Sequence, residues 1–278
     1  MAIYDIDGNP IQVAYNADGN PLAEAYDADG NPLYESSNQI VVMTYNPQWF
    51  TGINGQQAMQ NLIVSRNNPH IIGFQEFSKN GSVSTVASNM LTDYSYTQMS
   101  SHYNYLYMAS KIPMSNIQMA DFVNQRGETR AYMKCDIQVD GKTITWINTH
   151  LDYQYDSTQY AQMQEIFAIA EQCDYCIITG DFNNWATSIA DADYIGLYKP
   201  FVDAGYNLAN CTAERGFTKT WTDSSIATSP SEMTYPTDNI ITSSNISIDS
   251  VTFDTTKFSY LNGNSIDHIP IVAQLTVN

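Results

Sequence analysis

The sequence predicts an α+β fold, a four-layer α/β/β/α sandwich in which two mixed β-sheets pack face to face with helices outside. From residue 39 onward, short apolar runs rich in Val, Ile and Tyr alternate with segments of helical periodicity. Clusters of Gly, Asn, Asp and Ser bound the apolar runs, as turn residues bound strands. The 278 residues are 43% hydrophobic, which is enough for one large core or two modest ones.

The individual elements follow from periodicity and turn residues. Helices are predicted over 55–67, 82–91 and 157–172, and the last places Met163, Ile166 and Ala170 on one apolar face. Strands are predicted over 40–45, 71–74, 105–109, 117–122, 131–139, 143–148, 175–179, 239–242, 246–253 and 269–277. The strands 131–139 and 143–148 are expected to form a hairpin around Asp140-Gly141.

A β-hairpin-like segment over residues 1–36 is expected to precede the main domain, which spans 37–278. Tyr4, Tyr15 and Tyr26 each open a copy of an 11-residue repeat that contains Asp-Gly-Asn-Pro, a turn sequence. Asp-x-Asp-Gly also resembles the start of a calcium loop, but the downstream Glu is missing at the required spacing. Units this small cannot bury a core alone. We expect them to stack, oligomerise, mediate attachment or stay loosely ordered.

The charge balance bears on possible partners. The chain has 29 acidic and 11 basic residues, a formal net charge of −18, and such a surface repels polyanions. A nucleic-acid substrate then requires a locally basic groove or a bound divalent cation. No apolar run approaches the roughly 20 residues of a membrane span, and no signal peptide is visible. The compartment stays open between the cytoplasm and a phage-borne or otherwise secreted protein.

Cys173 and Cys176 form a C-x-x-C pair, which could indicate zinc or redox chemistry. No second pair completes a tetrahedral zinc set. The pair also runs directly into an apolar strand. We therefore expect reduced thiols in the core.

Six polar motifs lie at the ends of predicted strands, where loops gather them. They are Thr44-Tyr45-Asn46, Gln75-Glu76, Asn148-Thr149-His150-Leu151-Asp152, Gly180-Asp181-Phe182-Asn183, Thr237-Asp238-Asn239-Ile240 and Ser265-Ile266-Asp267-His268-Ile269-Pro270. Phosphodiester hydrolysis needs a water nucleophile and relief of charge on the phosphate and leaving oxygens. Mg²⁺ prefers oxygen ligands. Glu76 is the first candidate ligand, with Asn46 and Asp267 beside it.

These motifs, in this order from residue 40 to the end, resemble the endonuclease/exonuclease/phosphatase family. The family includes pancreatic-type deoxyribonuclease, abasic-site endonucleases, inositol-phosphate phosphatases and neutral sphingomyelinases. Gly-Asp-Phe-Asn together with the C-terminal Asp-His-x-Pro is the specific part of the resemblance. It implies a metal-dependent phosphoric ester hydrolase that uses Mg²⁺, with Mn²⁺ or Ca²⁺ as alternatives.

The resemblance also implies roles for the catalytic residues. Asp181 would orient or deprotonate the attacking water, and Asn183 would hold that water or the phosphate. His150 and His268 would donate hydrogen bonds to phosphate oxygens. Asp238 would hold His268 in the required tautomer and raise its basicity.

Three further residues are candidate substrate contacts. Arg130 resembles a family Arg that steadies phosphate, with Arg126 as its competitor. Ser110-Lys111-Ile112-Pro113 resembles a family segment that follows a phosphate-contacting side chain, a place that Tyr105 or Tyr107 could fill. The surrounding tyrosines could stack bases of a single strand, but we favour strand packing and surface positions for them. They are Tyr94, Tyr96, Tyr103, Tyr105 and Tyr107.

The leading hypothesis is a phosphodiesterase or nuclease that acts on DNA or RNA. The first alternative is a phosphomonoesterase or phospholipase C-like enzyme acting on inositol phosphates, nucleotides or sphingomyelin. The second is a non-catalytic attachment protein. The sequence leaves the leaving group, endo or exo action and the natural metal open.

Overall fold

The computed structural model describes residues 38–48, 56–78, 85–100, 106–211, 216–222, 229–259 and 267–278. The 11-residue repeat, the expected segment 1–36 and Tyr105 lie outside the described residues. Within them, no helix combines the length and the apolar character that crossing a bilayer requires.

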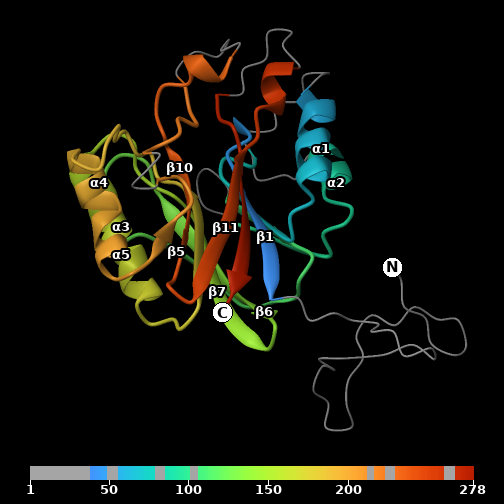
Figure 1. The fold of residues 1–278 in the computed structure, drawn as a ribbon, viewed down its shortest axis with the longest axis horizontal. Coiled ribbons are helices and arrows are strands. Elements are labelled where there is room, and N and C mark those ends of the chain that lie inside the picture. The colour runs from blue at the N-terminus through green and yellow to red at the C-terminus, as the bar shows by residue number, and fades with distance from the viewer. Residues whose placement is uncertain are drawn as a thin grey trace, which may run out of the picture.

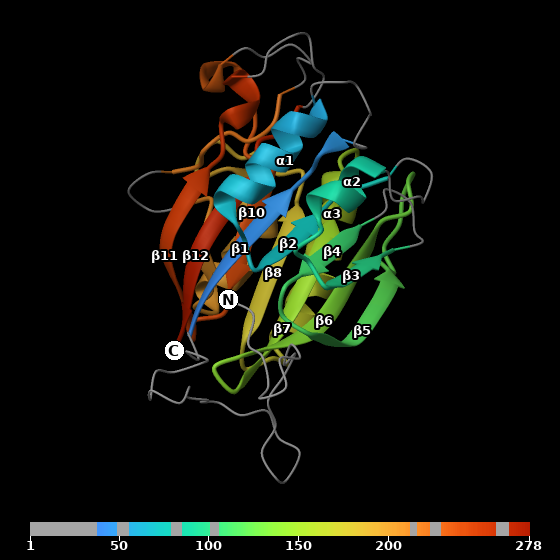
Figure 2. The same cartoon turned by 90° about the vertical axis from the view of Figure 1, so that its right-hand side faces the viewer.

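The first sheet contains six strands in the order β11-β12-β1-β2-β4-β3. Their bounds are β1 Gln39–Tyr45, β2 Ile71–Phe74, β3 Tyr96–Met99, β4 Tyr107–Ser110, β11 Ile246–Phe253 and β12 Ile271–Val277. Strands β1 and β2 are parallel and the other pairs are antiparallel. Figure 2 shows these strands side by side behind α1 and α2.

The second sheet contains six strands in the order β5-β6-β7-β8-β10-β9. Their bounds are β5 Met114–Asp121, β6 Ala131–Val139, β7 Lys142–His150, β8 Cys176–Asp181, β9 Asn207–Leu208 and β10 Asp238–Thr242. Its parallel pair is β7 and β8, and the other pairs are antiparallel. The predicted hairpin forms between β6 and β7, with Asp140 and Gly141 both at positive φ in its turn.

Helices cover the outer face of each sheet, which gives the four layers visible in Figure 1. Helices α1 (Gln56–Asn67) and α2 (Thr85–Met90) cover the first sheet. Helices α3 (Asp156–Ala170), α4 (Ala192–Leu197) and α5 (Lys199–Asp203) cover the second. Two short 3₁₀ turns, η2 (Pro230–Glu232) and η3 (Thr256–Ser259), lie in the connections. The predicted fold class is confirmed.

Three apolar clusters fill the spaces between the layers. The central cluster joins inward-facing side chains of both sheets, such as Val42, Trp146 and Ile240. The outer clusters lie under α1 and α2 and under α3 to α5. Strand β6 alternates buried and half-buried residues along most of its length, as expected where one face packs inward and the other meets a thinner layer.

A buried polar network crosses the central layer and fixes one sheet against the other. Gln75 Nε2 donates to Asn148 Oδ1 at 2.8 Å, and Asn148 Nδ2 donates to the carbonyl of Phe74 at 2.8 Å. Thr179 Oγ1 donates to Asn148 Oδ1 at 3.2 Å and accepts from Trp146 Nε1 at 3.0 Å. Because each polar group is paired, the network sets the register of β2 against β7 and β8.

The predicted elements differ from the observed ones mainly at their ends. Strands β7 and β8 run on to His150 and Asp181, so both candidate catalytic residues are the last residues of strands. Strand β5 begins at Met114, three residues before the predicted start. Strands β3 and β9 and helices α4 and α5 were not predicted from the sequence.

Candidate active site

Strand ends from both sheets meet at one edge of the sandwich. Asn46 follows β1, and Glu76 lies two residues after β2. In the second sheet, His150 and Asp181 are paired in register at the ends of the parallel strands β7 and β8. Asp238 opens the antiparallel strand β10 directly opposite Asp181. The topology therefore brings residues that are far apart in sequence to one place.

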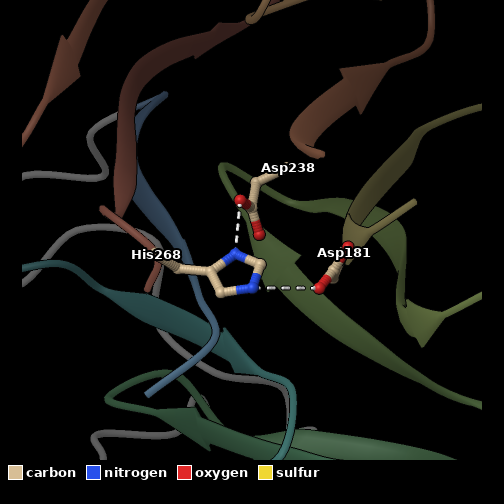
Figure 3. Close-up of side chains that lie close together, drawn as sticks. All are labelled: Asp181, Asp238 and His268. Atoms are coloured by element: carbon tan, nitrogen blue, oxygen red, sulfur yellow. Dashed lines mark hydrogen bonds and ion pairs between the residues drawn. The ribbon is translucent and has the colours of Figure 1, made fainter. Parts of the chain in front are cut away.

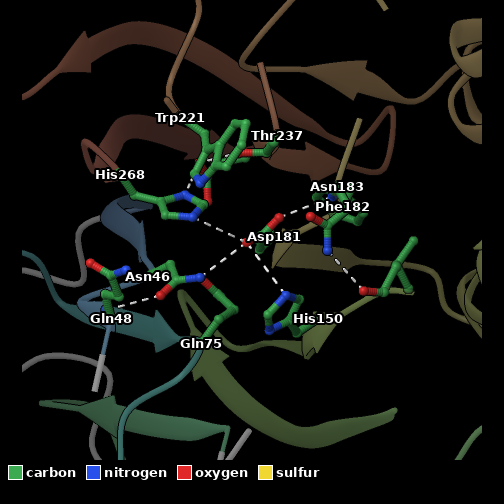
Figure 4. A network of polar contacts seen from close by, with 12 residues as sticks. Asn46, Gln48, Gln75, His150, Asp181, Phe182, Asn183, Trp221, Thr237 and His268 are labelled. Atoms are coloured by element: carbon green, nitrogen blue, oxygen red, sulfur yellow. Dashed lines mark hydrogen bonds and ion pairs between the residues drawn. The ribbon is translucent and has the colours of Figure 1, made fainter. Parts of the chain in front are cut away.

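Asp181 lies at the centre of the polar contacts in Figure 4. Its Oδ2 accepts a hydrogen bond from Asn46 Nδ2 at 3.0 Å. The Nε2 atoms of His150 and His268 lie 3.5 Å and 3.6 Å from the same oxygen. Its Oδ1 accepts the backbone N–H of Asn183 at 2.9 Å. Three donor side chains thus converge on one position, which is the arrangement that binds an anionic oxygen.

His268 lies between two carboxylates, as Figure 3 shows. Its Nδ1 is 2.9 Å from Asp238 Oδ2, an oxygen that also accepts from Thr237 Oγ1 at 3.0 Å. Burial lowers the pKa of His268, but the carboxylates of Asp238, Asp267 and Asp181 outweigh burial and raise this pKa to about 10. The ring is therefore an imidazolium at neutral pH.

The pKa values of Asp181 and His150, which are both buried, shift in opposite directions. Burial raises the pKa of Asp181 to about 7, and Asp238 adds to this against the opposing effect of His268. Burial lowers the pKa of His150 well below its ordinary value, helped by Arg130 and His268. The neutral His150 keeps one ring N–H, and its Nδ1 is buried with no hydrogen-bond partner.

Glu76 and Asp267 form a second pair of acidic groups beside this centre. Burial raises the pKa of Glu76, and the Asp267 carboxylate raises it further. Asp267 Oδ2 accepts from Gln48 Nε2 at 3.2 Å and from Trp221 Nε1 at 3.0 Å, whereas its Oδ1 receives no hydrogen bond and lies 3.8 Å from His268 Nε2. A carboxylate oxygen without a hydrogen-bond donor can serve as a ligand of a hard cation, so Asp267 Oδ1, with the Glu76 carboxylate that it influences, is a candidate site for a divalent ion.

A second set of candidate ligand atoms belongs to Asp181, Asp238 and His268, which lie within 4.8 Å of one another. The 2.9 Å contact between His268 and Asp238 has the length of a hydrogen bond. We therefore interpret this set as an imidazole held by carboxylates, and the Glu76–Asp267 pair as the better cation site.

Asn46 makes contacts that differ from those expected of a ligand. Its amide nitrogen donates to Asp181, and its amide oxygen accepts the backbone N–H of Gln48 at 3.0 Å. It also hydrogen-bonds the Glu76 carboxylate and so lowers that group's pKa. These contacts support a role in aligning the two carboxylates.

Arg130 lines the same cleft with unused donors. The side chain is 3% exposed, and its Nη2 donates to Glu128 Oε2 at 3.1 Å. Its Nε and Nη1 are buried and have no hydrogen-bond partner. Buried guanidinium donors without a partner lower the stability of the fold unless a ligand accepts their hydrogen bonds. The oxygens of a phosphate group are suitable acceptors for them.

The backbone is strained where the site needs particular side-chain directions. Gln48, Glu76 and Asn183 have φ values of 47°, 47° and 49°. This left-handed region costs a residue other than Gly roughly 1–2 kcal/mol. Asn183 is held there by hydrogen bonds, since its Nδ2 donates to the carbonyl of Leu151 at 2.9 Å. Three of the six non-glycine residues at positive φ in the described part of the chain thus lie in or beside the cleft, and such strain is common at functional sites.

The cleft has a volume of about 310 Å³. It is lined by Glu76, Glu128, Arg130, His150, Tyr153, Asp181, Asn183, Trp185, Trp221, Thr237, Asp267 and His268. Most of the expected site residues thus lie together around one space that accommodates a phosphate group and its substituents.

The other candidate residues with described positions lie away from the cleft. Tyr107 is buried away from the cleft, where it stacks on Phe77 with ring centroids 3.9 Å apart, so its position does not favour a substrate contact. Arg126 lies over the Tyr155 ring, 4.1 Å from its centroid, and does not line the cleft. Tyr94 is buried and donates to the carbonyl of Pro69 at 2.8 Å, in line with the expected packing role.

Five residues of this region were not predicted from the sequence. They are Gln48, Glu128, Tyr153, Trp185 and Trp221. Gln48 lies two residues after Asn46, and Trp185 lies two residues after Asn183. Proximity to a motif was the available signal for these two. Trp221 lies in a polar segment with no neighbouring motif, so only the fold reveals it.

No family model and no curated protein matches the sequence significantly. Among solved structures, an endonuclease/exonuclease/phosphatase from Bacteroides vulgatus is similar with a TM-score of 0.68 and 16% identity, over 86% of this chain and 99% of that one. TDP2 from D. rerio, complexed with a single-strand DNA product, gives a TM-score of 0.66 and 14% identity over 85% and 98%. An endonuclease/exonuclease/phosphatase from Beutenbergia cavernae gives 0.65 and 12% over 86% and 72%.

At these identities the similarity establishes the architecture. The chain has the fold of the endonuclease/exonuclease/phosphatase proteins, and the resemblance carried by its motifs is confirmed at that level.

Proposed function

We propose that the protein is a metal-dependent phosphodiesterase that acts on nucleic acid. One observation carries this proposal: three donor side chains converge on Asp181 Oδ2 at the edge of a cleft that also holds Arg130 and three further acidic side chains. This combination meets the needs of phosphoryl transfer, namely a base, donors for the phosphate oxygens and a cation site.

Glu76 and Asp267 would hold the cation, because the two carboxylates interact electrostatically and Asp267 Oδ1 receives no hydrogen bond. Mg²⁺ is the expected ion, with Mn²⁺ and Ca²⁺ as alternatives. When bound, the ion would supply positive charge for the phosphate and leaving oxygens.

The proton chemistry follows from the protonation states. A pKa of about 7 makes Asp181 a competent general base near neutral pH. Asn183 holds the Asp181 carboxylate through its backbone N–H. The imidazolium of His268 and the neutral ring of His150 would each donate an N–H to a phosphate oxygen, and Arg130 would add its unpaired donors.

The charge of the cleft favours a diester over a monoester. Four acidic side chains line it, and one of them, Glu128, already neutralises part of Arg130. A phosphodiester carries one negative charge, whereas a phosphomonoester carries about two at neutral pH. A monoester would therefore meet greater repulsion. The DNA product bound to TDP2, a protein of the same fold, supports a nucleic-acid substrate.

The test is cleavage of single-stranded and plasmid DNA by the purified protein with Mg²⁺, Mn²⁺ or Ca²⁺, each against a chelator control. We expect metal-dependent cleavage that falls at least about a hundredfold in Asp181→Ala. Asp203→Ala removes an exposed carboxylate paired with Lys199 and should leave cleavage unchanged. Intact DNA in every condition would refute the nuclease assignment.

A substrate panel separates the remaining alternatives. Inositol phosphates, nucleotides and sphingomyelin are incubated under the same metal conditions. Turnover of these compounds with no action on DNA would favour the phosphomonoesterase or phospholipase C-like alternative. Activity that survives unchanged in Asp181→Ala would favour a non-catalytic protein with a contaminating activity.

A further inference from the structure

Three aromatic rings form a stack that extends from the cleft toward solvent. The rings of Trp185 and Tyr235 lie with centroids 4.8 Å apart and planes 19° apart. Tyr235 and Trp221 follow at 6.0 Å and 21°. At the inner end, Trp221 Nε1 donates to Asp267 Oδ2 at 3.0 Å. Trp185 and Trp221 both line the cleft, so the stack begins beside the candidate cation site.

The backbone holds this stack in place. The fully buried Asn184 donates to the carbonyl of Pro236 at 3.2 Å and accepts the backbone N–H of Ala186 at 2.9 Å, which fixes the loop that carries Trp185. Tyr235 and Trp221 exchange backbone hydrogen bonds of 2.9 Å and 3.1 Å. These contacts fix the backbone next to Trp185 and the position of Tyr235, on which the Trp185 ring stacks.

Trp185 is 46% exposed although it is one of the largest apolar side chains at the cleft. Tyr235 covers one of its faces, and a planar group that enters the cleft can cover the other. We propose that Trp185 stacks on an unpaired nucleobase adjacent to the phosphate in the cleft, and that the substrate is a single strand. This inference rests on the proposed phosphodiesterase function.

The geometry favours a base over a quaternary ammonium headgroup such as choline. A quaternary ammonium is recognised by rings that surround it as a cage. Here the rings are parallel, and the stack offers one open face, which suits a flat group. A base in a duplex is already covered on both faces, so only an unstacked base can bind to Trp185.

The test compares two oligonucleotides with identical phosphates, one with normal bases and one in which every base is replaced by an abasic tetrahydrofuran residue. In Trp185→Ala, kcat/KM for the normal oligonucleotide should fall by about tenfold, mainly through KM. The abasic oligonucleotide should be cleaved equally by both enzymes. Trp185→Phe keeps an aromatic face and should retain most of the activity.

Ile189→Ala is the matched control, because Ile189 is 56% exposed on the same loop and does not line the cleft. It should behave as the wild type. An equal loss on both oligonucleotides in Trp185→Ala would overturn the stacking role, as would no loss on either. A loss confined to sphingomyelin would instead assign the ring to a choline headgroup. If the wild type cleaves neither oligonucleotide, the proposed function itself falls, and the inference with it.

Discussion

Asp181 is the residue where function and stability are most clearly opposed. Burial raises its pKa to about 7, above the value of about 3.9 in an unfolded chain. The folded state therefore favours the protonated form. Protonated Asp181 therefore contributes its full share to the free energy of unfolding below about pH 4. This contribution is lost as the pH rises through about 7. Above that pH, the buried charge destabilises the metal-free fold.

Asp181→Asn should accordingly stabilise the protein when a chelator is present. The gain in the free energy of unfolding should be small near pH 4, should grow as the pH rises and should level off above about pH 7, at a few kcal/mol. Urea denaturation at several pH values measures it. Asp203→Asn, at an exposed carboxylate, should show no such trend. A pH-independent gain would contradict the burial argument.

Cys173 is predicted to be the most reactive thiol among the four. Hydrogen bonding from Cys176 lowers its pKa to about 6, assisted by Thr145 and Lys134 and opposed by burial. It is half-buried, whereas Cys176 is fully buried and its pKa is raised. Because the thiolate is the nucleophile, Cys173 should be alkylated readily near neutral pH.

Iodoacetamide labelling followed by peptide mass spectrometry tests this. The labelling rate of Cys173 should rise with pH and approach its plateau above about pH 6, and Cys176→Ala should move that rise toward about pH 8.5. The half-buried Cys211 serves as an internal reference. A profile unaffected by Cys176→Ala would contradict the assigned cause.

At the residue scale, the motifs identified the carboxylates and imidazoles of the site because each lies in a short recognisable pattern at a strand end. The roles of residues that act through contacts between strands could not be predicted from the sequence. Glu128 is visible as a partner of Arg130 only once the turn before β6 has formed. Asn46 was expected as a ligand, but its donor contact to Asp181 follows from the juxtaposition of β1 and β8. Its role as a ligand stays a prediction.

At the scale of elements, the close approach of the two sheets depends on Gly73 in β2. A Cβ at this position would overlap the Thr179 side chain of β8 and lie 2.6 Å from Asn148 Oδ1 of β7. Both belong to the polar network that crosses the central layer. A methyl group here would push the sheets apart and leave buried donors unpaired.

Gly73→Ala should lower the free energy of unfolding by roughly 1–3 kcal/mol or more, which urea denaturation measures. Catalysis should fall as well, because Glu76 lies two residues after β2 and Asp181 ends β8. Thr179→Gly removes the side chain that the new methyl group would overlap. The double variant Gly73→Ala/Thr179→Gly should therefore lose less free energy of unfolding than the two single variants added together. Strict additivity would show that the two positions do not clash.

The elements that the sequence predicted are those with strong periodic signals. Helix α3 presents Met163, Ile166 and Ala170 to the core at helical spacing and was found within two residues at either end. Helices α4 and α5 have six and five residues, too few for a periodic pattern to emerge. Strand β3 is half exposed and carries no continuous apolar run, so its pairing with β4 decides its conformation.

At the scale of the whole molecule, the order of strands and helices was sufficient to predict the layered sandwich, whereas the pairing order within each sheet was not. The parallel pairs β1–β2 and β7–β8 occupy similar central places in the two sheets. That symmetry brings two sets of strand carboxyl ends to one edge, where the cleft lies. Such long-range pairing leaves no local trace in a single sequence.

The formal net charge of −18 makes a prediction about ionic strength. A basic nucleic-acid-binding protein loses affinity as salt rises, because salt weakens its attraction to phosphates. Here the surface repels the substrate, and salt screens that repulsion as the Debye length shrinks from about 30 Å at 0.01 M to about 8 Å at 0.15 M. With saturating metal, kcat/KM for an oligonucleotide should therefore rise over this range. A dinucleoside monophosphate, with a single charge, should respond much less. A fall in kcat/KM for the oligonucleotide would contradict this prediction. It would mean that Arg130 and the bound cation dominate the electrostatic potential that the approaching substrate meets, and that the acidic surface faces away from its path.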